Sequence, residues 1–229
     1  MSDWWVTSTW QQSPVIFVSQ VVWVIGSIVL HELAHGVAAI WRGDRTPIET
    51  GHMTWNPVVH MGQASLIMFA LFGIAWGQMP VDRSRLRGPY SDALVSIAGP
   101  IMNLILFCIA LAASAATVVY LKRLGDPLGP NLFMFFITGA YLNLALMIFN
   151  LLPVPPLDGS RILGDIVPAY SNLWNGPNAQ FVGLAAFAAV FLFGGKWAFQ
   201  AADHVTVQAL DVVLQWLGHT PLGGGGSAP

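Results

Sequence analysis

Residues 15–40 read VIFVSQVVWVIGSIVLHELAHGVAAI, and this stretch decides the fold. It is apolar except for His31, Glu32 and His35. An apolar segment of about 20 residues, wound as an α-helix, spans the hydrocarbon core of a bilayer. Residues 15–40 therefore predict a transmembrane helix. An ionised side chain at the centre of such a helix costs about 3 kcal/mol or more, so polar side chains there indicate a functional site.

The composition of the whole chain is typical of a membrane protein. Of the 229 residues, 55% are hydrophobic and 9% are charged, whereas a soluble domain carries about 25% charged residues. The nine basic and eleven acidic residues nearly cancel and form no basic face, which argues against a nucleic-acid partner and leaves the lipid bilayer as the expected surroundings. Cys108 is the single cysteine, so an internal disulfide and a thiolate zinc cluster are excluded.

Three further segments are long enough to cross a bilayer. Residues 93–121 and 131–157 carry no charge, and residues 179–202 contain only Lys196. Lipid offers the backbone no hydrogen-bond partners, so each span must be helical. The sequence therefore predicts an all-α polytopic membrane protein with about four spanning helices in one membrane-embedded domain, residues 15–218.

Shorter segments complete the expected architecture. Residues 63–79 are free of charge but only 17 residues long, which is marginal for a span. Residues 203–218 are amphipathic and predict a helix on the membrane surface. Residues 1–14 lack the positive start of a signal peptide, so we expect residues 15–40 to stay in the mature protein. The distribution of arginines described below predicts that residues 1–14 are extracytoplasmic. Residues 219–229 include a glycine-rich run that predicts a flexible tail.

The sequence His31-Glu32-Leu33-Ala34-His35 matches the H-E-x-x-H pattern. Two histidines four residues apart lie one above the other on a helix, so both imidazoles can bind one zinc ion. Glu32 then lies beside the metal as a general base for water. The alternative is a pair of histidines that hydrogen-bond across a helix bundle beside a buried acid. Within lipid this alternative requires that all three polar side chains find hydrogen-bond partners although they have no function.

A zinc hydrolase usually has three protein ligands and an open fourth position, so a third ligand is needed. Asp158 is distinctive because it follows an apolar run that ends in PVPPLDG, residues 153–159. Three prolines in four residues end a helix and leave carbonyl groups unpaired. Irregular backbone at membrane depth is tolerated where it lines a site. The alternative is that Asp158 is the N-cap of a short helix over residues 159–167.

Three stretches of the chain resemble one known family. They are residues 31–35, the AGPIMN sequence at 98–103, and NLLPVPPLDG at 150–159. Together they resemble the site-2 proteases, which are intramembrane zinc metalloproteases, and in particular their small form without a PDZ or CBS domain. The likeness extends from about residue 15 to residue 163.

The resemblance implies a role for each matched residue. His31, His35 and Asp158 would hold one Zn²⁺ per chain, and Glu32 would be the catalytic general base. Asn150 would position the substrate or stabilise the oxyanion, although an interhelical hydrogen bond is an open alternative for it.

Two further positions have weaker assignments. Asn103 matches a family position, and we favour a structural role for it. The segment NPVVH, which ends at His60, is similar to a pattern in one bacterial subgroup and carries no assigned role. The motif around the third ligand departs from some members of the family at Leu157.

A shared metal restricts the topology. The ligands lie toward the C-terminal ends of their helices, so these two helices must run in the same direction. An even number of crossings then separates them, which makes residues 63–79 a re-entrant or interfacial segment. Most arginines fall on the side of the site, and Lys122 and Arg123 fall on the other. By the positive-inside rule, the metal site opens toward the cytosol, in a plasma or bacterial inner membrane.

The expected activity is hydrolysis of a peptide bond in or near a transmembrane segment of another membrane protein. The β-like loop at residues 46–55 is the best candidate for a strand edge that holds the substrate extended, with a plain loop as the alternative. A membrane metal carrier or channel would need a continuous polar path, yet residues 93–121 offer only small hydroxyls and Asn103. A catalytically silent family member that binds partners is a third reading. The resemblance implies membrane-held regulators as the substrate class, and the oligomeric state is left open.

Overall fold

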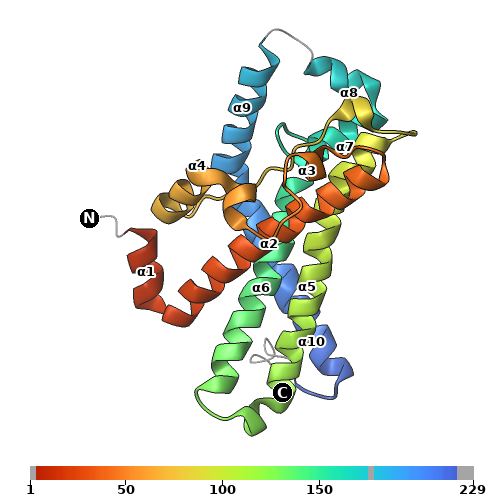
Figure 1. Cartoon of the computed structure of the whole chain (residues 1–229). Helices are drawn as coiled ribbons and strands as arrows, with labels where there is room; N and C mark the ends of the chain where they lie inside the picture. Colours follow the sequence, from red (N-terminus) through yellow and green to blue (C-terminus); the bar gives the residue numbers. More distant parts are fainter. Residues whose placement is uncertain (1–3, 175–177, 221–229) are drawn as a thin grey trace.

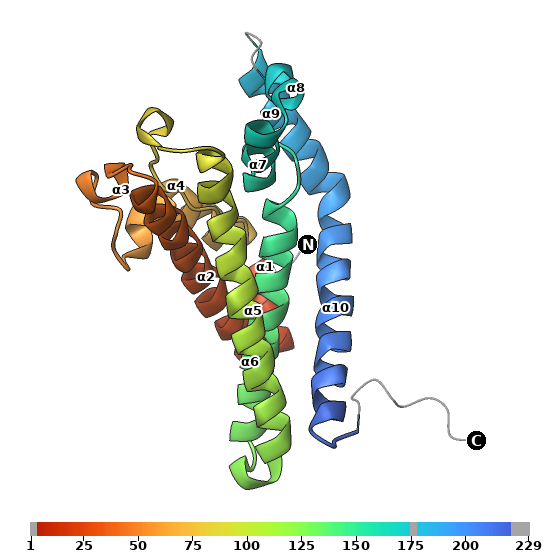
Figure 2. The same cartoon turned by 90° about the vertical axis from the view of Figure 1, so that its right-hand side faces the viewer.

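The computed structural model describes residues 4–174 and 178–220, and these residues contain helices and no strand (Figures 1 and 2). Most of the predicted tail, residues 221–229, lies outside the described residues. The helices, in chain order, are α1 (Trp5–Gln12), α2 (Pro14–Trp41), α3 (Thr46–Glu49), α4 (Pro57–Phe72), η1 (Arg83–Arg85), α5 (Ser91–Leu124), α6 (Leu128–Asn150), α7 (Asp158–Ile166), α8 (Pro168–Leu173), α9 (Ala179–Ala189), η2 (Val190–Gly194) and α10 (Gly195–Trp216).

Within the described residues, four helical segments are long and apolar enough to span a membrane. They are α2, most of α5, α6, and a continuous run through α9, η2 and α10. The all-α polytopic fold is therefore confirmed. Helix α6 ends at Asn150 rather than at the expected residue 157, because Pro153, Pro155 and Pro156 have no N–H to continue the helix.

Residues 203–218 do not form a separate surface helix as expected. They continue α10 along the bundle (Figure 2). Their apolar stripe is buried against the other helices, with Leu210 3% exposed and Leu214 fully buried. An amphipathic pattern looks the same whether its apolar face covers lipid or protein, which is why the sequence did not separate the two arrangements.

Small side chains let the spanning helices approach closely. Ala110 and Ala140 are fully buried in the core shared by α5, α6 and α10. A Cβ atom at Gly139 of α6 would overlap the indole ring of Trp23 of α2, and the Trp23 Nε1 donates a hydrogen bond of 2.9 Å to the carbonyl of Phe135. Close packing through small residues is how membrane helices associate, and here it joins α2 to α6.

Helix α4 enters the molecule and the chain then turns back. The helix is interrupted at Gly62 and ends at Gly73, both with positive φ. On the return, the N–H of Gln78 donates a hydrogen bond of 2.9 Å to the carbonyl of His60. Helix α4 therefore lies beside the bundle (Figure 1), and its re-entrant or interfacial position in a membrane stays a prediction.

The N-terminal tryptophans bind the last turn of α4. Trp4 and Trp5 donate their indole N–H groups to the carbonyls of Leu71 and Ala70, at 2.8 and 3.2 Å. Both carbonyls belong to the last turn of α4, where intrahelical donors are lacking. Helix α1 therefore helps to fix the end of α4.

The expected strand edge at residues 46–55 is wrong. This segment begins with the short helix α3 and continues in turns. Asp44, which is fully buried, accepts hydrogen bonds from the backbone N–H and hydroxyl of Thr46 and from the N–H of Asp82. A buried carboxylate satisfied in this way fixes a compact loop, and the β-branched residues Thr46 and Ile48 lie in α3 instead of a strand.

Helices α2 and α6 run in the same direction, and α5 runs back between them in the chain (Figures 1 and 2). The C-terminal ends of α2 and α6 lie at the end of the molecule that carries α3, η1, α7 and α8. The connection from α5 to α6 lies at the opposite end. The parallel pair that a shared metal requires is therefore present, and the compartment that each end faces stays a prediction.

Cysteines placed at the two ends should be labelled from opposite sides of a membrane. Ser84 lies in η1, which precedes α5, and Asp126 follows the last turn of α5; both are exposed. In a Cys108→Ala background, Ser84→Cys should react with an impermeant maleimide on one face of sealed vesicles only, and Asp126→Cys on the other face only. Labelling of both variants from the same face would contradict the fold.

Candidate metal centre

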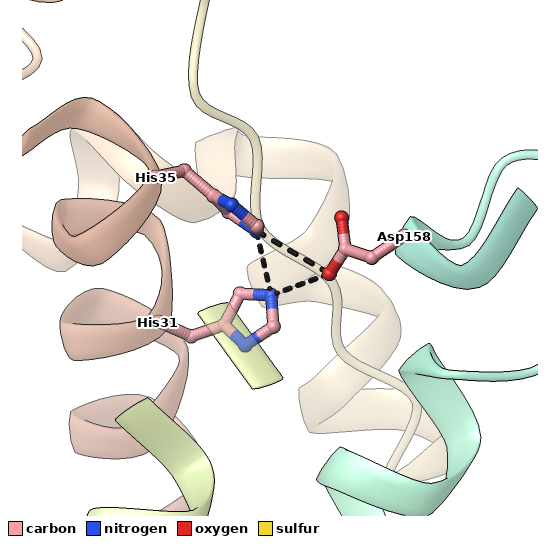
Figure 3. A group of neighbouring side chains, drawn as sticks. All are labelled: His31, His35 and Asp158. Atoms are coloured by element: carbon pink, nitrogen blue, oxygen red, sulfur yellow. Dashed lines mark hydrogen bonds and ion pairs between the residues drawn. The ribbon is translucent and has the colours of Figure 1, made fainter. Parts of the chain in front are cut away.

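Two elements bring three potential metal ligands together. His31 and His35 lie one turn apart on α2, and Asp158 is the first residue of α7. All three are buried, with exposed fractions of 7%, 7% and 9%. Figure 3 shows both imidazole rings and the carboxylate pointing toward one another.

The ligand atoms are close enough to share one ion. The Nε2 atoms of His31 and His35 are 3.0 Å apart. The Oδ2 atom of Asp158 lies 3.1 Å from the first and 3.3 Å from the second. Ligands at 2.0 to 2.1 Å from a tetrahedral zinc ion are about 3.3 Å apart, so the spacing fits such an ion.

A backbone carbonyl fixes the protonation of His35. The Nδ1 atom of His35 is 2.8 Å from the carbonyl oxygen of Val95. A carbonyl oxygen can only accept, so Nδ1 must carry a proton. In the neutral ring, Nε2 then presents a lone pair toward Asp158 and His31.

A chain of amide groups fixes His31 in the same way. The Nδ2 of Asn143 donates to the carbonyl of Gly139 at 2.9 Å, which turns the Oδ1 of Asn143 toward Asn103. Asn103 donates to this oxygen at 3.0 Å, so its own Oδ1 faces the Nδ1 of His31 at 2.6 Å. The His31 Nδ1 is therefore a donor, and its Nε2 also presents a lone pair.

Three lone pairs thus converge in a buried space. Within the described residues, the Oδ2 of Asp158 accepts no hydrogen bond from a backbone N–H or from an uncharged side chain. Electron pairs at these distances repel one another unless a cation lies among them. Two neutral imidazoles and one carboxylate are a zinc donor set that leaves a fourth position open. The cluster therefore fits Zn²⁺ better than a pair of histidines that hydrogen-bond to each other.

Gly99 of α5 lies directly over the two imidazoles. A Cβ atom at this position would collide with the Nε2 atoms of both His31 and His35. A glycine is therefore needed for α5 to pass so close to the ligands. Gly99 had no predicted role, although a Gly-Pro pair inside an apolar span is a usable signal.

Glu32 lies beside the cluster on α2 and is 7% exposed. Its carboxylate interacts electrostatically with both histidines and Asp158. No protein group among the described residues is recorded as donating a hydrogen bond to it. The backbone of Gly77 passes so close that a Cβ atom there would be 2.5 Å from the Glu32 Oε1. The carboxylate is thus held in place by packing, with its oxygens free to accept a proton.

Asn150 and His60 do not belong to the cluster of His31, His35 and Asp158. The side-chain amide of Asn150 donates to the carbonyl of Leu146 in its own helix at 3.0 Å, so its role in positioning substrate stays a prediction. His60 is fully buried, and its Nε2 is 2.7 Å from the carbonyl of Thr54. His60 therefore helps to hold the loop that precedes α4.

Asp158 is not an N-cap. Helix α7 begins at Asp158 itself, its N-cap residue is Leu157, and no side chain caps it. Asn143, by contrast, was missed by the sequence analysis. An amide in a span without any charged residue is a signal of an internal hydrogen bond, and Asn143 provides that bond to Asn103.

The fold and the cluster together define a multi-pass membrane protein with a buried group of metal ligands. The family model described as "Peptidase family M50" matches residues 118–194, a region that includes Asp158. No solved structure matches the chain.

Curated relatives carry related names. The chain is 39% identical over 150 residues to "Putative zinc metalloprotease YwhC" of Bacillus subtilis (strain 168), which covers 65% of this chain and 68% of the relative. It is 32% identical over 156 residues to "Putative zinc metalloprotease Rip2" of Mycobacterium tuberculosis, which covers 65% of this chain and 57% of that relative. The chain belongs to peptidase family M50, the site-2 protease family.

A side chain at Gly99 should displace the metal ligands. Gly99→Ala should lower the affinity for zinc at least about tenfold, because its methyl group would push both imidazoles apart. Gly26→Ala is the matched control, since a Cβ atom at Gly26 of α2 meets nothing within 4 Å. Zinc content measured after dialysis against a chelator would compare the two, and equal zinc retention would contradict the packing described here.

Removal of the Asn103 acceptor should also weaken metal binding. Asn103→Leu leaves the His31 Nδ1 without an acceptor, so we expect zinc affinity to fall about 10- to 100-fold. Asn131→Leu, at an exposed position near the start of α6, controls for the change from amide to alkyl. An unchanged affinity of Asn103→Leu in chelator competition would show that the amide chain does not orient the ring.

Proposed function

We propose that the protein is an intramembrane zinc metalloprotease that hydrolyses a peptide bond in or near a transmembrane segment of another membrane protein. The convergence of His31, His35 and Asp158 in a buried space among apolar helices carries this proposal. Membership of peptidase family M50 supports the reaction class.

In this proposal His31, His35 and Asp158 hold one Zn²⁺ per chain. A zinc ion bound by three side chains supplies Lewis-acid activation of water at neutral pH. The hydrogen bonds from His31 to Asn103 and from His35 to the carbonyl of Val95 keep both Nε2 atoms oriented toward the ion. Such partners also raise the basicity of the ligands.

Glu32 is the general base of the proposed reaction. It precedes Leu33 in the turn between the two histidines, and packing against Gly77 limits the positions of its Oε1. A carboxylate without a protein donor can accept a proton from water at Oε and pass it to the nitrogen of the leaving amine. The burial of Glu32 keeps bulk water away from this transfer.

The irregular stretch 74–82, which returns from α4, is a better candidate for holding the substrate than the loop at residues 46–55. The N–H groups of Trp76 and Gln78 are bonded on the α4 side, to the Ser65 hydroxyl and the His60 carbonyl. Alternate residues of an extended chain face opposite sides, and Gly77 faces Glu32. A substrate added alongside Gly77 would lie extended next to the general base.

The proposed partners are the lipid bilayer and a transmembrane protein substrate of the membrane-held regulator class. The arginine-rich end of the molecule, where α2 and α6 end, is proposed to face the cytosol of a plasma or bacterial inner membrane. The oligomeric state is left open by this proposal.

Separate variants should distinguish metal binding from proton transfer. In proteoliposomes with a panel of membrane-anchored peptides, Glu32→Gln should retain zinc at about one ion per chain and lose at least about 100-fold in cleavage rate. Asp158→Ala should lose both zinc and activity. Unchanged cleavage by Glu32→Gln would exclude the proposed base. Zinc flux through sealed vesicles without cleavage by the wild type would favour a metal carrier instead.

A further inference from the structure

The outward side of α10 carries a row of polar side chains. Gln200, His204, Gln208 and Gln215 are all exposed, and they follow one another at intervals of four, four and seven residues. Residues at these intervals share one side of an α-helix. These four residues are called the polar row below.

The polar row lies opposite the side of α10 that packs into the protein. The packed side consists of buried residues, namely Ala198, Ala202, Thr206, Leu210 and Leu214. Gln200, His204 and Gln208 each come two residues before one of them, and two residues correspond to about 200° around an α-helix. The polar row therefore points away from the bundle.

Ring contacts with α6 give the depth of the polar row. The ring centroids of Phe199 and Tyr141 are 6.3 Å apart, and those of Phe191 and Phe149 are 5.8 Å apart. Both contacts are spaced eight residues apart on each chain segment, so the two helices are antiparallel and keep about the same register, as Figure 2 shows. In that register residues 200–208 lie alongside the first half of α6. Because α6 is long and apolar enough to span a membrane, this part of the polar row lies at membrane depth.

The side chains that border the polar row indicate lipid surroundings. Val205 and Val212 on one flank are 43% and 48% exposed, and Val207 on the other flank is 44% exposed. Exposed valines are typical of a helix that faces lipid. The polar row between them forms no hydrogen bond within the described residues. Polar side chains of a spanning helix rarely face lipid, because they lose hydrogen bonds there, and they usually bind a neighbouring helix.

The chemistry of the polar row makes it complementary to itself. Copies of one protein enter a membrane in the same orientation, so a two-fold axis along the membrane normal places two α10 helices parallel, with each residue beside its own counterpart. A glutamine amide has both donors and an acceptor, and a neutral histidine ring has one of each. Each polar group can therefore pair with the same group of a second copy. A different partner would need matching polar groups at the same depths.

The spacing of the outward side also suits a helix pair. Ala201, His204, Gln208 and Gln215 follow the three- and four-residue steps of a heptad seam, which is the pattern of left-handed helix pairs. The small side chain of Ala201 allows the two helices to approach closely. Asp211 on the same side lies level with the first turn of α6, at the boundary of the span, where a charge can keep contact with water.

We propose that the polar row is the interface of a parallel homodimer, in which a second copy of this chain covers it. Pairs of Gln200, His204 and Gln208 form hydrogen bonds across the two-fold axis within the membrane, and Gln215 pairs near its boundary. The proposal goes beyond the proposed function and does not depend on it. The polar row lies on the half of α10 that is remote from α7, where the third metal ligand is located (Figure 2).

Cysteine cross-linking tests which side of α10 meets the second copy. In a Cys108→Ala background, the full chain in liposomes carries Ala201→Cys, Gln208→Cys or Gln215→Cys on the outward side, or the flanking changes Val205→Cys or Val212→Cys. A disulfide needs Cα atoms within about 7 Å of each other. After mild oxidation with copper phenanthroline, the three outward positions should give covalent dimers, and the flanking positions should give at least about fivefold less.

The strength of association is measured on matched variants. Copies labelled with a donor or an acceptor dye at Asp126→Cys, also in the Cys108→Ala background, are mixed over a range of protein-to-lipid ratios, and energy transfer gives the dimer Kd. The double change Gln200→Leu with Gln208→Leu should raise this Kd about tenfold or more, because two interhelical hydrogen-bonded pairs are lost. Asn131→Leu makes the same kind of change at an exposed amide of α6 and should leave the Kd nearly unchanged.

Three outcomes would overturn the proposal. One is equal cross-linking at the outward and the flanking positions, and another is the same Kd for the double variant and the wild type. The third is a wild type that stays monomeric at every protein-to-lipid ratio, which would assign the polar row to lipid headgroups or water.

Discussion

The mutual repulsion of three lone pairs is the constraint on which the rest of the structure depends. The Nε2 atoms of His31 and His35 and the Oδ2 of Asp158 lie 3.0 to 3.3 Å apart in a buried space. Protein groups hold both rings in the tautomer that points a lone pair inward. Such an arrangement is costly as it stands and becomes favourable around a cation. The surrounding helices therefore form a frame, meaning the packed segments that hold these three atoms close together.

The frame is built from close approaches that only glycine allows. Gly99 lets α5 pass over the imidazoles, Gly139 lets α6 pack on Trp23 of α2, and Gly77 lets the returning chain cover Glu32. In lipid there is no hydrophobic force between helices, so contact at short range supplies the attraction. The same contacts bring the end of α6, and with it the turn that carries Asp158, to the level of the two histidines.

Much of this organisation could be predicted from the sequence, and the failures have physical causes. The spans follow from uninterrupted apolar length, and the cluster follows from the spacing of His31 and His35 and from the proline-rich turn before Asp158. The short helix α3 and the turns that follow it up to residue 55 could not be predicted, because their fold depends on the buried Asp44 and its contacts with Thr46 and Asp82. Periodicity likewise does not show whether Leu214 packs against other helices or against lipid, and in the structure it is buried in the protein core.

The amide chain behind His31 has a direction, and that direction comes from the main chain. Asn103 and Asn143 could each turn over and exchange oxygen for nitrogen, but the carbonyl of Gly139 at the far end can only accept a hydrogen bond. A peptide carbonyl of α6 thus fixes the orientation of two side-chain amides and one imidazole ring. The choice of the metal-facing nitrogen of His31 thus originates in a main-chain carbonyl and reaches the ring only through the two intact side-chain amides.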